Sequence, residues 1–289
     1  MLFILLVADI IGGIILEAAG VRAAVGSGAD LALVVLTYIL VIHWVRRRTG
    51  QPWSEIFPLQ PFQPTLLAPL LVMVLGFSIT GSEVDNLVRF SLPIPGVFKE
   101  ILRELVRPDF LSLAYIALLA PVFEELLFRG IILQGFLHHY SYPKAILSSA
   151  VLFAAFHLNP IQFFPALGTG LILAWLFVRT RSLWPCMLVH ALTNSIVWIM
   201  SVLLPLRIPG YMPANLLLDR VEFQPLWFDV LGVLSLVAGL KGLSRTLPTD
   251  VAESFQPAAT DTGSAESCPT SACAEANTAV AKTTADRHA

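Results

Sequence analysis

The sequence predicts an all-α membrane protein with about eight transmembrane helices and a disordered C-terminal tail. Its 289 residues are 56% hydrophobic and 13% charged, whereas soluble domains carry roughly 25% charged residues. The hydrophobic residues gather in runs, several of which approach the ~20 residues needed to cross a bilayer. These runs do not alternate with polar residues, as the ~10-residue strands of a membrane β-barrel do. A net charge of −2 gives no electrostatic basis for nucleic-acid binding.

The N-terminal region, residues 1–110, contains the first three expected transmembrane helices, at residues 2–18, 31–45 and 66–80. Arg46, Arg47 and Arg48 follow the second run, and the positive-inside rule makes that end cytoplasmic.

Residues 81–110 are predicted to form a polar loop on the opposite side of the membrane. Within this loop, residues 98–106 have the pattern of an amphipathic helix. Such a helix lies in the membrane interface or packs on the bundle, and the pattern favours neither.

The other five expected helices lie in a core of residues 111–205 and a last membrane segment of residues 206–245. Their apolar runs are residues 111–137, 145–158, 163–178, 183–204 and 226–240. Basic residues near their assigned inner ends predict that both termini are cytoplasmic. The third, fifth and eighth of the eight runs are shorter than ~20 residues, so these helices must tilt or thin the bilayer locally.

Residues 246–289 are rich in Ala, Thr, Ser and acidic residues, which predicts a disordered tail. The short loops, and a sequence in which we find no organelle signal, favour a bacterial inner membrane.

Three ionisable residues, Glu124, Glu125 and Arg129, lie in the middle of the apolar run at 111–137. A charge at mid-membrane costs at least ~2.5 kcal/mol and therefore usually has a partner and a function. Glu125 and Arg129 are four residues apart, which predicts an ion pair on one helix face. Glu124 is rotated by ~100° from Glu125 and must find its partner elsewhere. The alternative is that all three are purely structural.

Two further polar clusters lie in apolar runs: Phe153 with His157, and His190 with Asn194. Each pair is four residues apart and shares a helix face. Counting ~1.5 Å per residue from the turn at residues 138–144 puts Glu124 and His157 at the same depth, ~20 Å from that turn. A lone histidine in an apolar run is otherwise more often a hydrogen-bonded core residue than a catalyst.

The same count puts His190 and Asn194 only ~9–15 Å deep. Either a segment at residues 181–185 that dips into the bundle or a tilted seventh helix would remove this mismatch.

A carboxylate, two histidines and an asparagine inside a membrane suit peptide hydrolysis. Burial raises the pKa of a carboxylate, which favours general-base catalysis near neutral pH. A His/Asn pair can donate hydrogen bonds to the oxyanion of a tetrahedral intermediate. Glu124, His157 and His190 could instead bind zinc, since two His and one Glu form a known catalytic set. The sequence lacks the His-Glu-x-x-His signature of ordinary zinc proteases.

The cysteines do not favour a structural metal site. Cys186 lies in an apolar run, and Cys268 and Cys273 lie in the tail. No Cys-x-x-Cys motif or Cys/His cluster suggests a zinc finger or a disulfide framework.

The three clusters resemble, in order, the motifs of the CPBP family of intramembrane proteases, which includes CAAX proteases and bacteriocin-processing proteins and is also called the Abi family. The motifs are Glu124-Glu125-x-x-x-Arg129, Phe153-x-x-x-His157 and His190-x-x-x-Asn194, and the resemblance covers residues 111–199. It implies an eight-helix membrane endopeptidase.

The resemblance also implies a role for each motif residue. Glu124 would be the general base, His157 would help to activate water, and His190 and Asn194 would stabilise the oxyanion. Glu125, Arg129 and Phe153 would support them. Family members have been labelled metalloproteases, but a Glu/His-activated water needs no cofactor, and we favour that mechanism over zinc.

The expected substrate is a membrane-associated peptide or protein, with lipidated ones among the candidates, processed as in CAAX cleavage or bacteriocin maturation and immunity. One alternative is a non-catalytic scaffold or immunity protein of the same fold. Another is a transporter, because buried Glu and His residues also form proton relays. We find no paired broken helices of the kind that inverted-repeat transporters have.

Overall fold

The computed structural model describes residues 28–92, 108–158, 160–203, 208–211 and 221–248, and these residues form helices and connections with no strand. The all-α prediction is therefore confirmed for this part of the chain. The first apolar run, the amphipathic segment at 98–106 and almost all of the C-terminal tail fall outside the described residues, so these assignments stay predictions.

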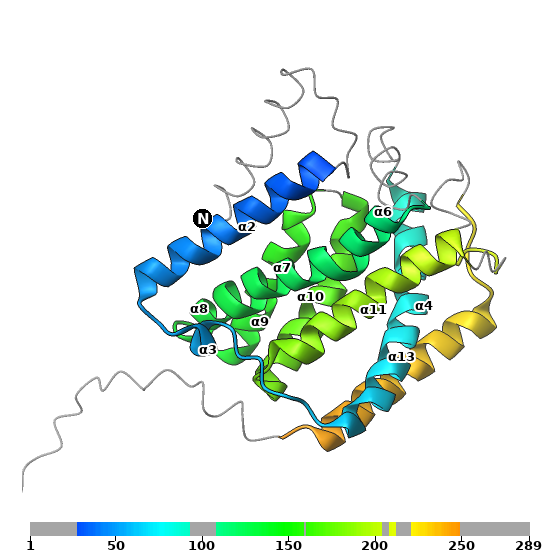
Figure 1. Ribbon diagram of the computed structural model, residues 1–289. Coiled ribbons are helices and arrows are strands. Elements are labelled where there is room, and N and C mark those ends of the chain that lie inside the picture. Colours follow the sequence, from blue (N-terminus) through cyan, green and yellow to red (C-terminus); the bar gives the residue numbers. More distant parts are fainter. Residues whose placement is uncertain (1–27, 93–107, 159, 204–207, 212–220, 249–289) are drawn as a thin grey trace, which may run out of the picture. The chain divides into compact units, whose positions relative to one another are not determined.

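Six long helices carry the described part of the fold (Figure 1). They are α2 (Gly28–Thr49), α4 (Leu67–Ser91), α9 (Tyr142–Phe156), α10 (Pro160–Thr180), α11 (Leu183–Val202) and α13 (Leu226–Thr246). Among the described residues, four spans are long and apolar enough to cross a membrane, and α9 is a shorter apolar helix. These four spans are Pro64–Ser91, Gln162–Thr180, Leu183–Met200 and Leu226–Thr246. The protein is thus an integral membrane protein, and the figure of eight helices is only approximate.

The fourth predicted run forms one helical path with two π-helical segments. Its successive parts are α6 (Phe110–Ala114), η2 (Tyr115–Leu119), α7 (Ala120–Leu127), η3 (Phe128–Leu133) and α8 (Gln134–Leu137). The path begins at Asp109, whose side chain accepts a hydrogen bond from the Ser112 N–H and caps the helix. π-Helical turns are rare and are frequent at functional sites. Here they flank α7, which carries both glutamates.

The prediction of a loop from residue 81 was wrong, because α4 continues to Ser91. The polar residues in this stretch have partners inside the protein instead of facing water. Asn86 donates to the Gly210 carbonyl at 2.7 Å and to Glu83 at 2.8 Å. Glu83 in turn accepts the backbone N–H of Gln224 at 3.1 Å. A polar stretch can therefore remain helical when another segment satisfies its side chains.

The connection between α2 and α4, residues 53–66, is hereafter called the strap. It includes the short helices α3 (Trp53–Ile56) and η1 (Pro64–Leu66). Gln134 of α8 donates to the Ile56 carbonyl at 2.8 Å, and the Phe57 ring packs so closely on Gly130 that it would lie 2.7 Å from a Cβ there. The Ser182 hydroxyl donates to the Gln60 carbonyl at 2.6 Å. The strap therefore holds the start of α8 and the start of α11 together.

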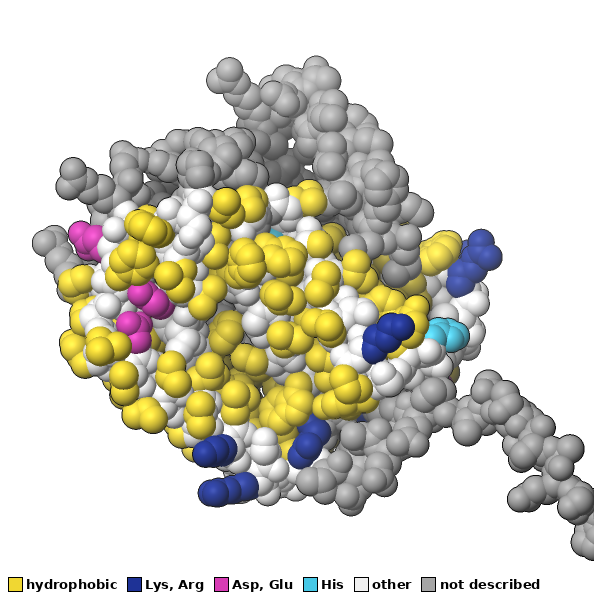
Figure 2. Space-filling view, turned by 180° about the vertical axis from the view of Figure 1, so that it is seen from behind, with side chains coloured by type: hydrophobic (Ala, Val, Ile, Leu, Met, Phe, Trp, Pro, Cys, Tyr) yellow, Lys and Arg dark blue, Asp and Glu magenta, His cyan; other side chains and the backbone are white. Residues whose placement is uncertain are grey.

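The outer surface of the described helices is strongly hydrophobic (Figure 2). Along α13, exposed apolar side chains include Leu226, Trp227, Leu231 and Leu234. Basic side chains gather toward the lower and right margins of the face that Figure 2 shows. An apolar face with charges at its edges is what a bilayer requires of an embedded helix bundle.

Candidate active site

Glu125 and Arg129 form the predicted ion pair. Arg129 Nη1 lies 2.9 Å from Glu125 Oε1, and both side chains are completely buried. Arg129 also donates from Nη2 to the Gly170 carbonyl of α10 at 3.1 Å, and its guanidinium lies 4.7 Å from the centre of the Phe153 ring. A buried charge needs this degree of pairing and hydrogen bonding. The pair therefore joins α7 and η3 to α9 and α10.

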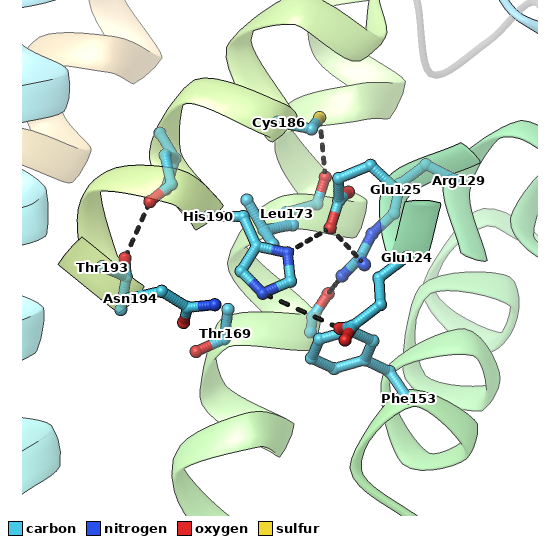
Figure 3. Close-up of polar contacts among 12 residues, drawn as sticks. Glu124, Glu125, Arg129, Phe153, Thr169, Leu173, Cys186, His190, Thr193 and Asn194 are labelled. Atoms are coloured by element: carbon cyan, nitrogen blue, oxygen red, sulfur yellow. Dashed lines mark hydrogen bonds and ion pairs between the residues drawn. The ribbon is translucent and has the colours of Figure 1, made fainter. Parts of the chain in front are cut away.

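His190 of α11 lies between the two glutamates (Figure 3). Its Nδ1 is 2.8 Å from Glu125 Oε1, and its Nε2 is 3.8 Å from Glu124 Oε2. A carboxylate at one ring nitrogen fixes the imidazole orientation and leaves the other nitrogen for a second partner. Glu125 therefore positions His190 as well as Arg129, a role that the helix spacing alone had not suggested.

The depth mismatch expected for His190 was wrong, because His190 lies at the level of Glu124 and Glu125. The count assumed that the start of α11 lies at the bundle surface. Instead, Ser182 is 1% exposed and the Leu183 N–H donates to the Pro58 carbonyl of the strap at 2.9 Å. The first of the two explanations, a segment that dips into the bundle, agrees with this burial.

Glu124 has a mostly buried side chain that is 15% exposed. Its Oε2 makes no hydrogen bond to any described group, and the contact that the structure shows for it is the 3.8 Å approach to His190. The depth count had put His157 of the neighbouring helix at the level of Glu124 and had put His190 at a shallower level. The carboxylate is therefore paired with α11 where a hairpin partner on α9 was expected.

His157 lies at the C-terminal end of α9, where Leu158 adopts a left-handed conformation with φ of 50°. Its Nδ1 lies 3.0 Å from the Phe153 carbonyl, and the two rings are 5.1 Å apart. Phe153 also meets the His190 ring edge to face at 5.6 Å. Phe153 therefore packs against both histidines, which agrees with the supporting role implied for it.

Asn194 lies one turn after His190 and donates from Nδ2 to the Ile116 carbonyl at 3.0 Å. Ile116 belongs to the π-helical segment η2. An amide nitrogen carries two N–H groups, so this bond leaves one for another acceptor.

His157, His190 and Asn194 line one cavity of about 200 Å³. The wall that α4 contributes was missed by the sequence interpretation. It includes Phe77, Ser78, Gly81, Ser82, Asp85 and Arg89. The spacing of Asp85 and Arg89, four residues apart like Glu125 and Arg129, was a signal for a second buried pair.

The zinc set of Glu124, His157 and His190 does not fit the arrangement of these side chains. Within the described ranges, no three His, Cys, Asp or Glu side chains converge as ligands for a metal ion. We therefore derive no step through a metal.

Comparison with known proteins agrees with the motifs. Residues 107–196 match the family model described as type II CAAX prenyl endopeptidase Rce1-like. This segment contains Glu124, Glu125, Arg129, His157, His190 and Asn194, so the resemblance to CPBP intramembrane proteases is confirmed. The match supports a membrane protease of the CAAX type acting on a peptide or protein. No curated protein and no solved structure matched the chain.

Proposed function

We propose that the protein is an intramembrane endopeptidase that hydrolyses a peptide bond with a water molecule activated by Glu124 and a neighbouring histidine. The buried carboxylate of Glu124, 3.8 Å from His190 Nε2, carries this proposal. The gap is too long for a direct hydrogen bond. The separation suits two groups that act on one reacting centre.

In the proposed reaction, Glu124 takes a proton from water while the water oxygen attacks the peptide carbonyl carbon. The resulting oxyanion accepts hydrogen bonds from the second N–H of Asn194 and from Nε2–H of His190; this step uses the doubly protonated ring, because Nδ1–H already donates to Glu125. Collapse of the intermediate breaks the C–N bond, and Glu124 returns its proton to the leaving amine.

Three other residues support this chemistry in the proposal. His157 lines the cavity that also contains His190 and Asn194, and in the proposal it assists in holding the water. Glu125 and Arg129 act as positioning residues, because Glu125 bonds to both Arg129 and His190. The proposed mechanism uses no cofactor.

The proposed substrate is a membrane-associated peptide or protein, and the family description makes a prenylated CAAX sequence the first candidate. Such a sequence has a prenylated cysteine followed by two aliphatic residues and a terminal residue. Maturation of a bacteriocin or another membrane peptide belongs to the same proposal. We further propose a bacterial inner membrane with both termini on the cytoplasmic side, because basic residues lie in the last turns of α2 and α13.

A Glu124→Gln variant in proteoliposomes tests the catalytic role. Loss of a general base lowers the rate by ~10²–10⁴-fold, and we expect a loss of this size in the cleavage of candidate peptides followed by mass spectrometry. Glu55→Gln is the matched control, because Glu55 lies exposed on α3 and away from the cavity. Equal cleavage by both variants would contradict the proposal. A cellular effect that survives replacement of Glu124, His157 and His190 together would indicate a scaffold.

A further inference from the structure

The Asp85–Arg89 ion pair is a buried charged feature that the proposed reaction does not use. Both residues line the cavity that also contains His157, His190 and Asn194. The Asp85 side chain is 19% exposed and that of Arg89 is 5% exposed. Apart from the histidines, they are the only charged residues among the described side chains lining this cavity. They also lie before residue 107, outside the matched family segment.

The position of this pair follows from the helix that carries it. Phe77, Gly81, Asp85 and Arg89 are each four residues apart and form one stripe of α4 along the cavity. Phe77 also lies with Thr193 of α11 around a smaller neighbouring cavity, so it marks the level of the proposed reaction. At ~1.5 Å per residue, the twelve residues from Phe77 to Arg89 rise by roughly 18 Å.

A cavity with apolar walls and one arginine near its far end suits a ligand that is mainly apolar and carries a carboxylate. The planar guanidinium matches a carboxylate in shape and donates paired hydrogen bonds to it. Asp85, one turn earlier, holds the guanidinium in place, as Glu125 holds Arg129. Every linear peptide with an unmodified C-terminus ends in such a carboxylate.

We propose that the Asp85–Arg89 pair of α4 binds the C-terminal carboxylate of the substrate peptide and so determines where the chain is cut. This inference rests on the proposed peptidase function. An extended chain spans at most ~3.3–3.6 Å per residue, so an extended peptide bridges roughly 18 Å with about five residues. Side chains on a helix lean toward its N-terminus, which brings the guanidinium closer to the reaction level. The scissile bond is therefore within about five residues of the C-terminus.

Peptide binding tests this inference separately from catalysis. The probe is a fluorescent peptide that ends in a prenylated cysteine, two aliphatic residues and a terminal residue, prepared as the free acid and as the amide. Each protein carries Glu124→Gln, so that bound peptide is not cleaved. Charge-assisted hydrogen bonds correspond to about ten- to hundredfold in affinity. We therefore expect the protein to bind the acid about ten- to hundredfold more tightly than the amide. Arg89→Gln should abolish this preference by weakening the binding of the acid alone.

Two further variants separate ligand binding from a structural role. Arg179→Gln is the matched control, because Arg179 bonds to the Leu247 carbonyl and does not line the cavity; this variant should keep the preference for the acid. Arg89→Lys retains the charge and should retain part of that preference. Equal weakening of acid and amide by Arg89→Gln, or no preference in the parent protein, would overturn the inference.

Cleavage assays with an intact Glu124 then distinguish the two proposals. Carboxylate-dependent binding without any Glu124-dependent cleavage would contradict the peptidase function and support the carboxylate-binding site. Glu124-dependent cleavage that is equally fast on the acid and the amide would support the peptidase function and contradict the carboxylate-binding site. A cut far from the C-terminus, well beyond five residues, would also overturn the inference.

Discussion

Two ion pairs with the same spacing have different surroundings in this protein. Glu125–Arg129 and Asp85–Arg89 both place an acid one turn before an arginine on an apolar helix. Glu125 and Arg129 are fully buried, and their other bonds go to His190 and to the Gly170 carbonyl. Asp85 and Arg89 border a cavity instead. Spacing alone therefore identifies an ion pair but does not tell whether it serves the fold or a ligand.

Because their surroundings differ, the two pairs should differ in how much folding stability is lost when one partner is removed. A fully buried pair depends on both partners, since removal of one leaves a charge that neither water nor protein can stabilise. A pair beside a cavity can exchange a lost partner for water or for a ligand. Three replacements sharpen this comparison.

The largest effect is expected for Arg129→Met. It leaves the carboxylate of Glu125 buried without its ion-pair partner, and breaking a buried pair costs about 3–5 kcal/mol. Chemical unfolding in detergent, followed by tryptophan fluorescence, measures the loss. Arg179→Met serves as the control for removing an arginine from a partly buried helix end. A loss no greater than in this control would show that the pair does not hold the helices together.

A smaller effect is expected when Glu125→Leu is combined with Arg129→Met. Replacing both members of a buried pair by apolar residues is often nearly neutral, although here His190 and the Gly170 carbonyl each lose a partner. We expect a loss of roughly 1–3 kcal/mol relative to the parent, the usual cost of an unsatisfied buried group. Activity should nevertheless fall with this double variant, since His190 is no longer positioned. A double variant as unstable as Arg129→Met alone would contradict the comparison.

The smallest effect on stability is expected for Arg89→Met. Asp85 remains beside the cavity, where water can reach its carboxylate, so the loss should be about 1 kcal/mol, the usual net contribution of one hydrogen bond. The same unfolding assay measures it. A loss as large as that of Arg129→Met would make the α4 pair structural and would remove the contrast between the two regions.

Local spacing predicted the parts of the site that depend on one helix. The Glu125–Arg129 pair and the packing of Phe153 under His157 follow from residues four apart, and both are present. The partner of Glu124 could not be found in this way. It depends on the level of α11, which the strap sets through Gln60 and Pro58, far from His190 in the sequence.

The polar stretch at 81–91 shows the other limit of sequence interpretation. Glu83 and Asn86 predicted a loop because polar residues usually face water. Their partners, Gly210 and the Gln224 backbone, lie more than 120 residues further along the chain. A pattern within one segment carries no information about such distant partners, so the α4 wall of the cavity was missed.

The strap determines which part of the chain can be transferred as a working unit into another membrane protein. The family match begins at residue 107, but Gln134, Gly130 and Ser182 within it are held by residues 56–60. A fragment cut at the borders of the match would contain every motif residue and lack the segment that sets their register. Transplantation of this catalytic unit into another membrane scaffold therefore requires the strap to accompany it, supplied in cis or as a separate peptide.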